Sequence, residues 1–336
     1  MTLAARYLSA RTLDTAPALS APPGPGEVEL APAYVGICGT DLHIFHGDMD
    51  APVAVPAVLG HEMAGHVVRV GPDVENWAPG DAVTVMPLLW DDACAACRNG
   101  HQHICQHLDF IGIDSPGAMQ QRWTVPASTL IRLPDSLPLD RAALVEPTAV
   151  AVHDVGRAEV RDGERVVVGG GPVGVLIALV ARAAGADVRV VELSAHRRLL
   201  AEELGLTAWN PADDDVPVLV REWTGDAGAD VAFEVLGVRG RLCLVAIHPR
   251  PREINLHRFF WRELTLVGAR LYDRSDFERA VALVADGTVP AERMISKVVP
   301  LTQAPAAFEA LEGGGDVMKI LVDCTDDSDD ARRAAV

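Results

Sequence analysis

Three cysteines lie close together in the segment WDDACAACRNGHQHIC, as Cys94, Cys97 and Cys105. Such a cluster is typical of a loop folded around a metal ion, and a structural zinc site needs four ligands. The other three cysteines are scattered along a chain of 336 residues, which makes a disulfide framework less favourable. The sequence therefore predicts a zinc-binding lobe with one ligand still to be found.

A second set of candidate metal ligands comes from three other segments. GICGTDLHIFHGD contains Cys38, LGHEMAGHVV contains the adjacent His61 and Glu62, and LVEPTAVAVH contains Glu146. One thiolate, one imidazole and one carboxylate, with water in the fourth position, form a catalytic zinc site. A lone cysteine or histidine is more often a core residue, so this prediction depends on the whole set.

A glycine-rich loop follows the apolar run RVVV. Gly169, Gly171 and Gly174 form a G-x-G-x-x-G pattern around Pro172 and Val173. The glycines allow a tight turn, close approach of a pyrophosphate and close packing of helix on strand, and the helix N-terminus offers free N–H groups. The flanking strand and helix favour a dinucleotide site over a plain glycine-rich turn.

An acidic residue supports the same interpretation. Glu192 ends the next predicted strand, 18 residues after Gly174, where an acid is expected on the ribose hydroxyls. Because Glu192 would repel a 2′-phosphate, we expect NAD rather than NADP. Arg197 and Arg198 follow closely, and they either accept a 2′-phosphate or lie on a solvated helix face.

The elements that position these residues fall into two parts. The first third is irregular, with short β-like runs rich in Pro and Gly. From about residue 150, strands alternate with helices, which predicts a parallel sheet. We expect a nucleotide-binding domain over 150–274 and a catalytic domain over 1–149 and 275–336, with the metal lobe at 88–108.

Charge and hydropathy exclude several classes of protein. The 47 acids exceed the 29 bases, which argues against a nucleic-acid-binding face. No apolar run reaches the length of a membrane helix, and the first residues lack the pattern of a signal peptide. We therefore expect a cytoplasmic protein with a small-molecule substrate, no nucleic acid and no membrane partner.

Taken in order, the motifs resemble those of a known family. GICGTDLH, GHEMAGHVVRVG, GPVG after a strand, and the cysteine lobe are similar to segments of the zinc-dependent medium-chain alcohol and polyol dehydrogenases. VEPTAVAVH resembles the sorbitol and 2,3-butanediol dehydrogenase branch. The resemblance implies a Rossmann-type doubly wound parallel sheet, an irregular β-rich GroES-like catalytic domain, and a homodimer or homotetramer.

The resemblance also implies roles for individual residues. Cys38 and His61 would bind the catalytic zinc, while Glu62 and Glu146 would share the remaining role in an order that the sequence leaves open. Three further residues would act around them, with Asp41 bracing His61, Thr40 binding the substrate alcohol and His43 passing its proton to solvent. Zinc would lower the pKa of the alcohol, and hydride would pass to the nicotinamide.

The missing ligand of the lobe follows from the same resemblance. The family carries four cysteines as C-x2-C-x2-C-x7-C, and the first position corresponds here to Asp91. We predict that Asp91 completes a structural zinc site, since carboxylate is a normal zinc ligand. An empty lobe held by packing is the alternative, and Asp92, His101 or His103 are other candidate ligands.

Other functions remain open at this stage. Zinc-free quinone or enoyl reductases share the architecture but lack the Cys38–His61 pair and the lobe. A threonine dehydrogenase-like enzyme and a non-catalytic NAD-binding descendant are further alternatives. The sequence does not distinguish a polyol, a vicinal diol and an inositol-like ring as substrate.

One connection in the predicted parallel sheet is too short. DVAFEV and RLCLVAI should be neighbouring parallel strands, yet only Leu236 to Arg241 lie between them. A parallel pair needs a crossover of about a dozen residues, usually a helix. The nucleotide domain is thus short by one helix near 237–240, and we hypothesise that the folded protein contains a helical segment there that this sequence lacks.

Overall fold

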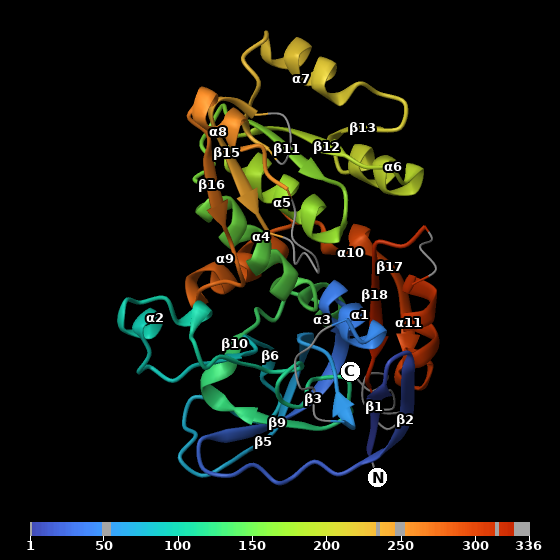
Figure 1. Cartoon of the computed structure of the whole chain (residues 1–336). Coiled ribbons are helices and arrows are strands. Elements are labelled where there is room, and N and C mark those ends of the chain that lie inside the picture. The colour runs from blue at the N-terminus through green and yellow to red at the C-terminus, as the bar shows by residue number, and fades with distance from the viewer. Residues whose placement is uncertain (1, 49–54, 233–235, 246–252, 313–315, 326–336) are drawn as a thin grey trace. The chain divides into compact units, whose positions relative to one another are not determined.

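The computed structural model describes residues 2–48, 55–232, 236–245, 253–312 and 316–325 (Figure 1). The chain divides into two compact units: unit 1 comprises residues 1–146 and 294–336, and unit 2 comprises residues 147–293. The second boundary therefore lies after residue 293, not after 274. The reason is α9 (Arg274–Ala285), which buries an apolar face and packs Phe277 edge-on against Tyr272 of unit 2.

Unit 1 is built mainly on antiparallel strands, although β17 and β18 pair in parallel. Its main sheet has seven strands in the order β10-β6-β5-β3-β18-β17, with β9 also paired to β3, beside a three-stranded sheet β2-β1-β4 and a two-stranded sheet β7-β8. The strands are β1 (Thr2–Ser9), β2 (Thr12–Ala18), β3 (Glu27–Gly36), β4 (Ala57–Val58), β5 (Glu62–Val70), β6 (Ala82–Val85), β7 (Leu88–Leu89), β8 (Asp109–Phe110), β9 (Trp123–Pro126), β10 (Leu130–Arg132), β17 (Ile295–Pro300) and β18 (Lys319–Asp323).

Short helices connect these strands. They are α1 (Gly39–His46), α2 (Ala95–Arg98), α3 (Leu139–Ala142) and α11 (Ala304–Glu312), with 3-10 turns at Gln102–Ile104, Ala127–Thr129 and Leu301–Gln303. The core between them is dense and apolar. It includes Leu30, Val35, Phe45, Met63 and Phe308, all 2% exposed or less. This core fixes the strand ends from which the candidate ligands extend.

Unit 2 contains a six-stranded parallel sheet in the order β13-β12-β11-β14-β15-β16. Counted along the chain, this is the 3-2-1-4-5-6 order of the Rossmann fold. Its strands are β11 (Arg165–Gly169), β12 (Asp187–Val191), β13 (Thr207–Trp209), β14 (Ala229–Val231), β15 (Leu236–Leu244) and β16 (Thr265–Gly268). The helices are α5 (Pro172–Ala183), α6 (Ala195–Glu203), α7 (Val216–Thr224), α8 (Leu256–Arg262) and α9, while α4 (Val145–Arg157) and α10 (Ala291–Met294) span the unit boundaries.

The short connection differs from the prediction. β14 and β15 are parallel, as expected, but the segment from Leu236 to Arg241 is not their connection, because it already belongs to β15. Leu236 pairs with Ala229 and Arg241 with Val231, so β15 bulges between these two pairings. In the sequence, four residues separate Val231 from Leu236, and three of them, 233–235, lie outside the described residues.

The crossing at this point requires a glycine. A Cβ atom on Gly237 would overlap the carbonyl oxygen of Ala227, because the two backbones pass in contact. Leu236 nevertheless packs in a core cluster with Val220 of α7. Apolar side chains nearby stay exposed, with Val238 at 72% and Phe260 at 75%. Phe260 lies on α8, whereas Val238 lies on β15, and exposure of Val238 is what a sheet face lacking one covering helix would show.

None of the helices in the described parts of the chain has the length and apolar character needed to cross a membrane.

Candidate active site and structural metal lobe

Three candidate ligands meet at one end of the unit 1 sheet. Gly36, the last residue of β3, is the antiparallel partner of Glu62, the first residue of β5. The residues just outside this pair, Cys38 and His61, are therefore brought together. Cys38, His61 and Glu62 each place one ligand atom within 4.8 Å of the other two. A zinc ion bonded at about 2.0–2.3 Å to each atom fits a group of this size.

His61 is held by a carboxylate and an aromatic ring. Its Nδ1 faces Oδ1 of Asp41 at 3.7 Å, and both side chains are buried. Neither atom has a hydrogen-bond partner among the described residues. A metal on the other ring nitrogen would direct the Nδ1 proton at Asp41, so these two atoms fit a zinc-bound histidine with a carboxylate brace. The ring of Phe110 packs edge-on at 5.0 Å between centroids.

The helix that carries Asp41 starts at the thiol. Cys38 is the N-cap of α1, and its backbone N–H donates to Oδ2 of Asp41 at 2.9 Å. Burial raises the pKa of Asp41. Burial lowers the pKa of His61, but Asp41 and Cys38 raise it more, so that the pKa ends well above its usual value. The site thus favours a cation between these groups.

Glu62 has a partner that sequence reasoning missed. The ammonium group of Lys319, on β18, forms an ion pair with Oε2 of Glu62, and both side chains are buried. A Cβ atom on Gly36 would overlap this carboxylate, so the glycine leaves the space in which the pair forms. Burial lowers the pKa of Lys319, but Glu62 and Cys38 raise it above its usual value. A lysine inside the apolar run VMKILVDC was the available signal, since such residues are rarely buried unpaired.

Glu146 lies outside the compact group of ligand atoms. It is buried in the first turn of α4, and its charge raises the pKa of both His61 and Lys319. Of the two acids, Glu62 and not Glu146 therefore belongs to the compact group with Cys38 and His61.

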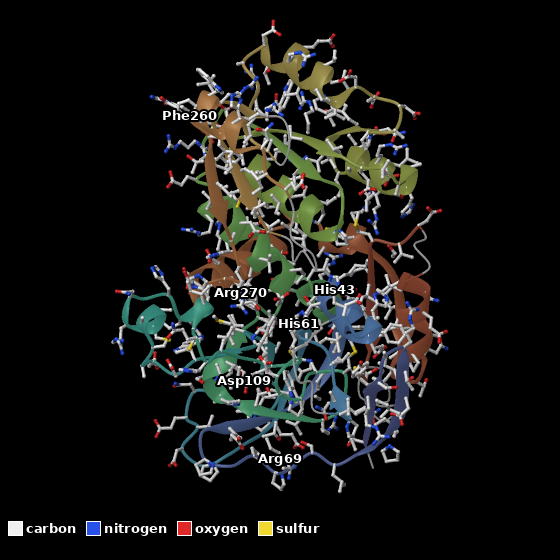
Figure 2. The ribbon with its side chains drawn as sticks, viewed as in Figure 1. His43, His61, Arg69, Asp109, Phe260 and Arg270 are labelled. Atoms are coloured by element: carbon white, nitrogen blue, oxygen red, sulfur yellow. The ribbon has the colours of Figure 1, made fainter. Side chains whose placement is uncertain are left out.

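Thr40 and His43 lie on α1, three residues apart and therefore on one face of the helix. Both are half-buried. Figure 2 shows His43 on α1 with His61 in the same unit. Within the described part of the chain no hydrogen bond joins Thr40 to His43, so a proton path between them would need a substrate or water as the link.

The cysteine lobe forms a second compact group. Asp91, Cys94, Cys97 and Cys105 each place a ligand atom within 4.8 Å of the others. Sγ of Cys94 lies 3.5 Å from Sγ of Cys97 and 3.8 Å from Sγ of Cys105. Tetrahedral zinc with bonds of about 2.3 Å would separate its sulfurs by about 3.8 Å. The group therefore fits the metal.

Backbone N–H groups surround the sulfurs. Cys94 Sγ accepts from the N–H of Cys97 and of Gln106, at 3.4 and 3.5 Å. These bonds lower the pKa of Cys94 to about 7, with that from Gln106 the largest cause. Burial, followed by the neighbouring thiols, raises the pKa of Cys97 to about 12. Cys94 therefore ionises readily to a thiolate, whereas ionisation of all three cysteines requires a cation bound between them.

Asp91 is fixed by three contacts. Its Oδ1 accepts from the N–H groups of Ala93 and Cys94, at 2.8 and 2.9 Å. Its Oδ2 lies 2.5 Å from Nδ1 of His107, a residue that the sequence pattern did not single out. The hydrogen bond with His107 is the largest cause holding the pKa of Asp91 well below its usual range. Asp91 is thus an anion that lies next to the three sulfurs.

The glycine loop has the form of a phosphate cradle. β11 ends at Gly169, and α5 starts with Pro172 at its first turn after the N-cap Gly171. A Cβ on Gly174 would overlap the carbonyl oxygen of Gly169, so helix and strand pack too closely for a side chain. The Cβ positions of Gly169 and Gly171 meet nothing within 4 Å, which leaves open space for a ligand over the loop. These features, with Val173 in the first turn, fit a dinucleotide.

Glu192 lies directly beside this loop. It follows β12, and a Cβ on Gly170 would come within 2.9 Å of its Oε2. Oε1 accepts from the N–H of Ser194 at 2.8 Å, and Oε2 is 3.9 Å from Nη1 of Arg197. Arg198 instead donates to the carbonyl oxygens of Glu192 and Leu193. Arg197 is therefore the arginine placed near the acid.

Comparisons with known proteins agree with this architecture. Residues 24–135 match the alcohol dehydrogenase GroES-like domain, and residues 172–286 match the zinc-binding dehydrogenase domain. The chain is 45% identical to 2-dehydro-3-deoxy-L-galactonate 5-dehydrogenase of Pseudoalteromonas atlantica, over 96% of this chain and 98% of that protein. It is 34% identical to (R,R)-butanediol dehydrogenase of Bacillus subtilis, over 89% and 92%.

A solved structure agrees over a similar length. The crystal structure of 2R,3R-butanediol dehydrogenase from Bacillus subtilis superposes with a TM-score of 0.89 at 30% identity, covering 96% of this chain and 99% of that one. The two domain matches and the relatives that are 45% and 34% identical over most of the chain show that it belongs to the zinc-containing medium-chain alcohol and polyol dehydrogenases.

Proposed function

We propose that this dehydrogenase uses zinc and NAD to interconvert a secondary alcohol group of a polyol, diol or sugar acid with the corresponding ketone. The observation that carries the proposal is the compact group of Cys38, His61 and Glu62, buried at one end of the unit 1 sheet. A protein that only bound NAD would not need a thiol, a histidine beside a carboxylate and a second buried carboxylate at one place.

The chain's own residues would hold and deprotonate the substrate. When bound by Cys38 and His61, zinc supplies a Lewis acid that lowers the pKa of an alcohol. Asp41 keeps the imidazole ring oriented, and Glu62, held by Lys319, is the carboxylate near enough to complete the ligand set or to exchange with substrate. Thr40 would accept a hydrogen bond from the substrate hydroxyl and, as it takes that proton, would pass its own through water or substrate to His43, which would release one to solvent.

The substrate proposal rests on the names of the relatives. The protein of 45% identity is named for a sugar acid oxidised at position 5, and that of 34% identity for butanediol. Both names describe oxidation of a secondary alcohol beside further oxygen substituents. A sugar acid is therefore our first choice, and a vicinal diol is the second.

The cofactor proposal rests on Glu192. A carboxylate next to the glycine loop accepts hydrogen bonds from ribose hydroxyls and repels a 2′-phosphate. Arg197, 3.9 Å away, offsets part of this repulsion. We therefore propose NAD as the preferred cofactor, with incomplete exclusion of NADP.

The lobe supports a second, structural zinc. We propose Asp91, Cys94, Cys97 and Cys105 as its ligands, because their spacing fits a tetrahedral metal. Metal analysis of the purified protein should then give about two zinc ions per chain, and Asp91→Ala should lower this to about one. One zinc per wild-type chain would contradict the proposal, while Asp91→Cys should tighten zinc retention.

We also propose a homo-oligomer in the cytoplasm. All six cysteines are free thiols, in keeping with a reducing compartment. At the end of the unit 2 sheet, β16 is paired only with β15 among the described strands, and Phe260 and Trp261 of α8 are exposed. An open strand edge with apolar neighbours favours pairing with a second copy.

The test of the enzyme proposal is a substrate screen followed at 340 nm, with NAD and a panel of sugar acids, diols and threonine. Cys38→Ser and His61→Ala should each abolish turnover while NADH binding, measured by fluorescence, survives. Near wild-type kcat in either variant would refute the zinc mechanism. Activity confined to threonine would instead favour a threonine dehydrogenase-like enzyme.

A further inference from the structure

We infer that His107 is a positioning residue of the metal lobe, which holds Asp91 so that a carboxylate can take the place of a fourth thiolate. This inference rests on the proposed structural zinc site. It starts from an unusual contact, because the imidazole is 73% exposed yet its Nδ1 lies 2.5 Å from Oδ2 of Asp91. An exposed side chain adopts so short a contact at the expense of its rotational freedom.

His107 contacts two members of the ligand group. Its backbone N–H donates to Sγ of Cys105 at 3.3 Å, while its ring reaches Asp91 from the other side. It therefore links the last ligand of the lobe to the first. The backbone contact survives any side-chain substitution, so a variant at this position tests the ring contact alone.

A carboxylate needs such support more than a thiolate does. The sulfur of a cysteine is placed by one side-chain torsion, whereas an aspartate oxygen is placed by two. Oδ1 of Asp91 is already held by the N–H groups of Ala93 and Cys94. The His107 contact fixes Oδ2 and with it the plane of the carboxylate. Hydrogen bonds to ligating carboxylates orient the ligand, and their loss typically weakens metal binding about 10–100-fold.

The decisive experiment measures the zinc affinity of the lobe by chelator competition. The full-length protein carries Cys38→Ser in every sample, so that the lobe alone retains tightly bound zinc. His107→Ala should weaken zinc binding about 10–100-fold. His107→Asn should restore most of the affinity, because Nδ2 of asparagine occupies nearly the same position as Nδ1 of histidine. The matched control is Gln106→Ala, an exposed side chain next to His107 whose backbone contact with Cys94 survives the substitution, and it should leave the affinity unchanged.

A double-mutant cycle separates positioning from a general effect on the fold. With Asp91→Cys in place, the fourth ligand is a thiolate, and His107→Ala should change the affinity by less than about threefold. An equal loss in both backgrounds, or no loss in the Asp91 background, would overturn the inference. If Asp91→Ala retains zinc like its parent, the proposed ligand set fails instead, which is a different result from a failure of His107 alone.

Discussion

The buried pair of Glu62 and Lys319 joins the candidate ligand group to β18. Removing one partner of a buried ion pair leaves an uncompensated charge and costs about 3–5 kcal/mol. We predict that Lys319→Met lowers the free energy of unfolding of the metal-free protein by this amount. The double variant Glu62→Gln with Lys319→Met should recover most of the loss in urea titrations. A single variant as stable as wild type would show that the pair is not formed.

At the same scale, we predict that the Glu192 side chain sets the preference between NAD and NADP. Glu192→Ala should raise the KM for NAD and lower the KM for NADP, because hydrogen bonds to the ribose are lost together with the repulsion of a 2′-phosphate. Arg197→Ala is the matched variant and should change the two KM values in favour of NAD. Steady-state kinetics with both cofactors measure this, and an unchanged NADP-to-NAD ratio in Glu192→Ala would remove Glu192 from its role.

Asp154 links stability to pH in unit 2. Burial raises the pKa of Asp154 to about 7. The charge of His153 lowers this pKa, and the charge of Asp276 raises it. Asp154 and Cys243 line the same small cavity. The folded protein therefore holds a proton that an unfolded chain, with a pKa of about 3.9, releases. Between these pH values the folded state binds more protons, so stability falls as pH rises, by at most about 1.4 kcal/mol per pH unit.

Asp154→Asn should remove this contribution, because the amide stays neutral. Urea midpoints at pH 5 and pH 7 should therefore differ less in the variant than in the wild type. The same difference in both proteins would mean that Asp154 titrates normally in the fold.

At the level of elements, the return from β14 to β15 is the anomaly. Only four residues separate Val231 of β14 from Leu236 of β15 in the sequence, where a parallel crossover usually has about a dozen, and Gly237 passes in contact with Ala227. If the natural protein contains a further helix here, its intact mass should exceed 35.8 kDa by about 1.3 kDa. A mass of 35.8 kDa by mass spectrometry would refute the hypothesis.

The intact mass also decides whether the exposed side chains on β15 and α8 are covered by a further helix in the natural protein. If the short return is real, Val238 belongs to an uncovered face of the sheet, Phe260 and Trp261 are exposed on α8, and the affinity for NAD should be low. Such a result would favour the alternative of a non-catalytic NAD-binding descendant.

At the level of the whole molecule, an edge strand in unit 2 predicts assembly. Light scattering after size exclusion should give a mass at least twice that of one chain. Leu266→Lys on β16, where the side chain is 43% exposed, should shift the mass toward the monomer while metal content stays the same. Lys297→Ala, on exposed β17 of unit 1, is the control. A monomeric wild type would contradict the proposal.

The sequence by itself determined the units of chemistry and much of the fold. Local patterns were sufficient for the glycine loop, the strand–helix alternation and the ligand candidates, because residues near in sequence set each of these features. Order along the chain was also enough to indicate the family. The family resemblance pointed to Asp91, and the structure brings its carboxylate close to the three cysteines, since all four lie on one short loop.

Only the tertiary structure decided which distant residues meet. Lys319 reaches Glu62 because β18 and β5 flank β3, a pairing across more than 250 residues that no local pattern encodes. His107 reaches Asp91 because the lobe folds back on itself. Helix α9 joins unit 2, and Leu236–Arg241 becomes strand rather than connection, because burial of apolar faces and backbone pairing are settled by the whole unit. Such contacts depend on packing between elements, so their physical cause lies outside any single segment.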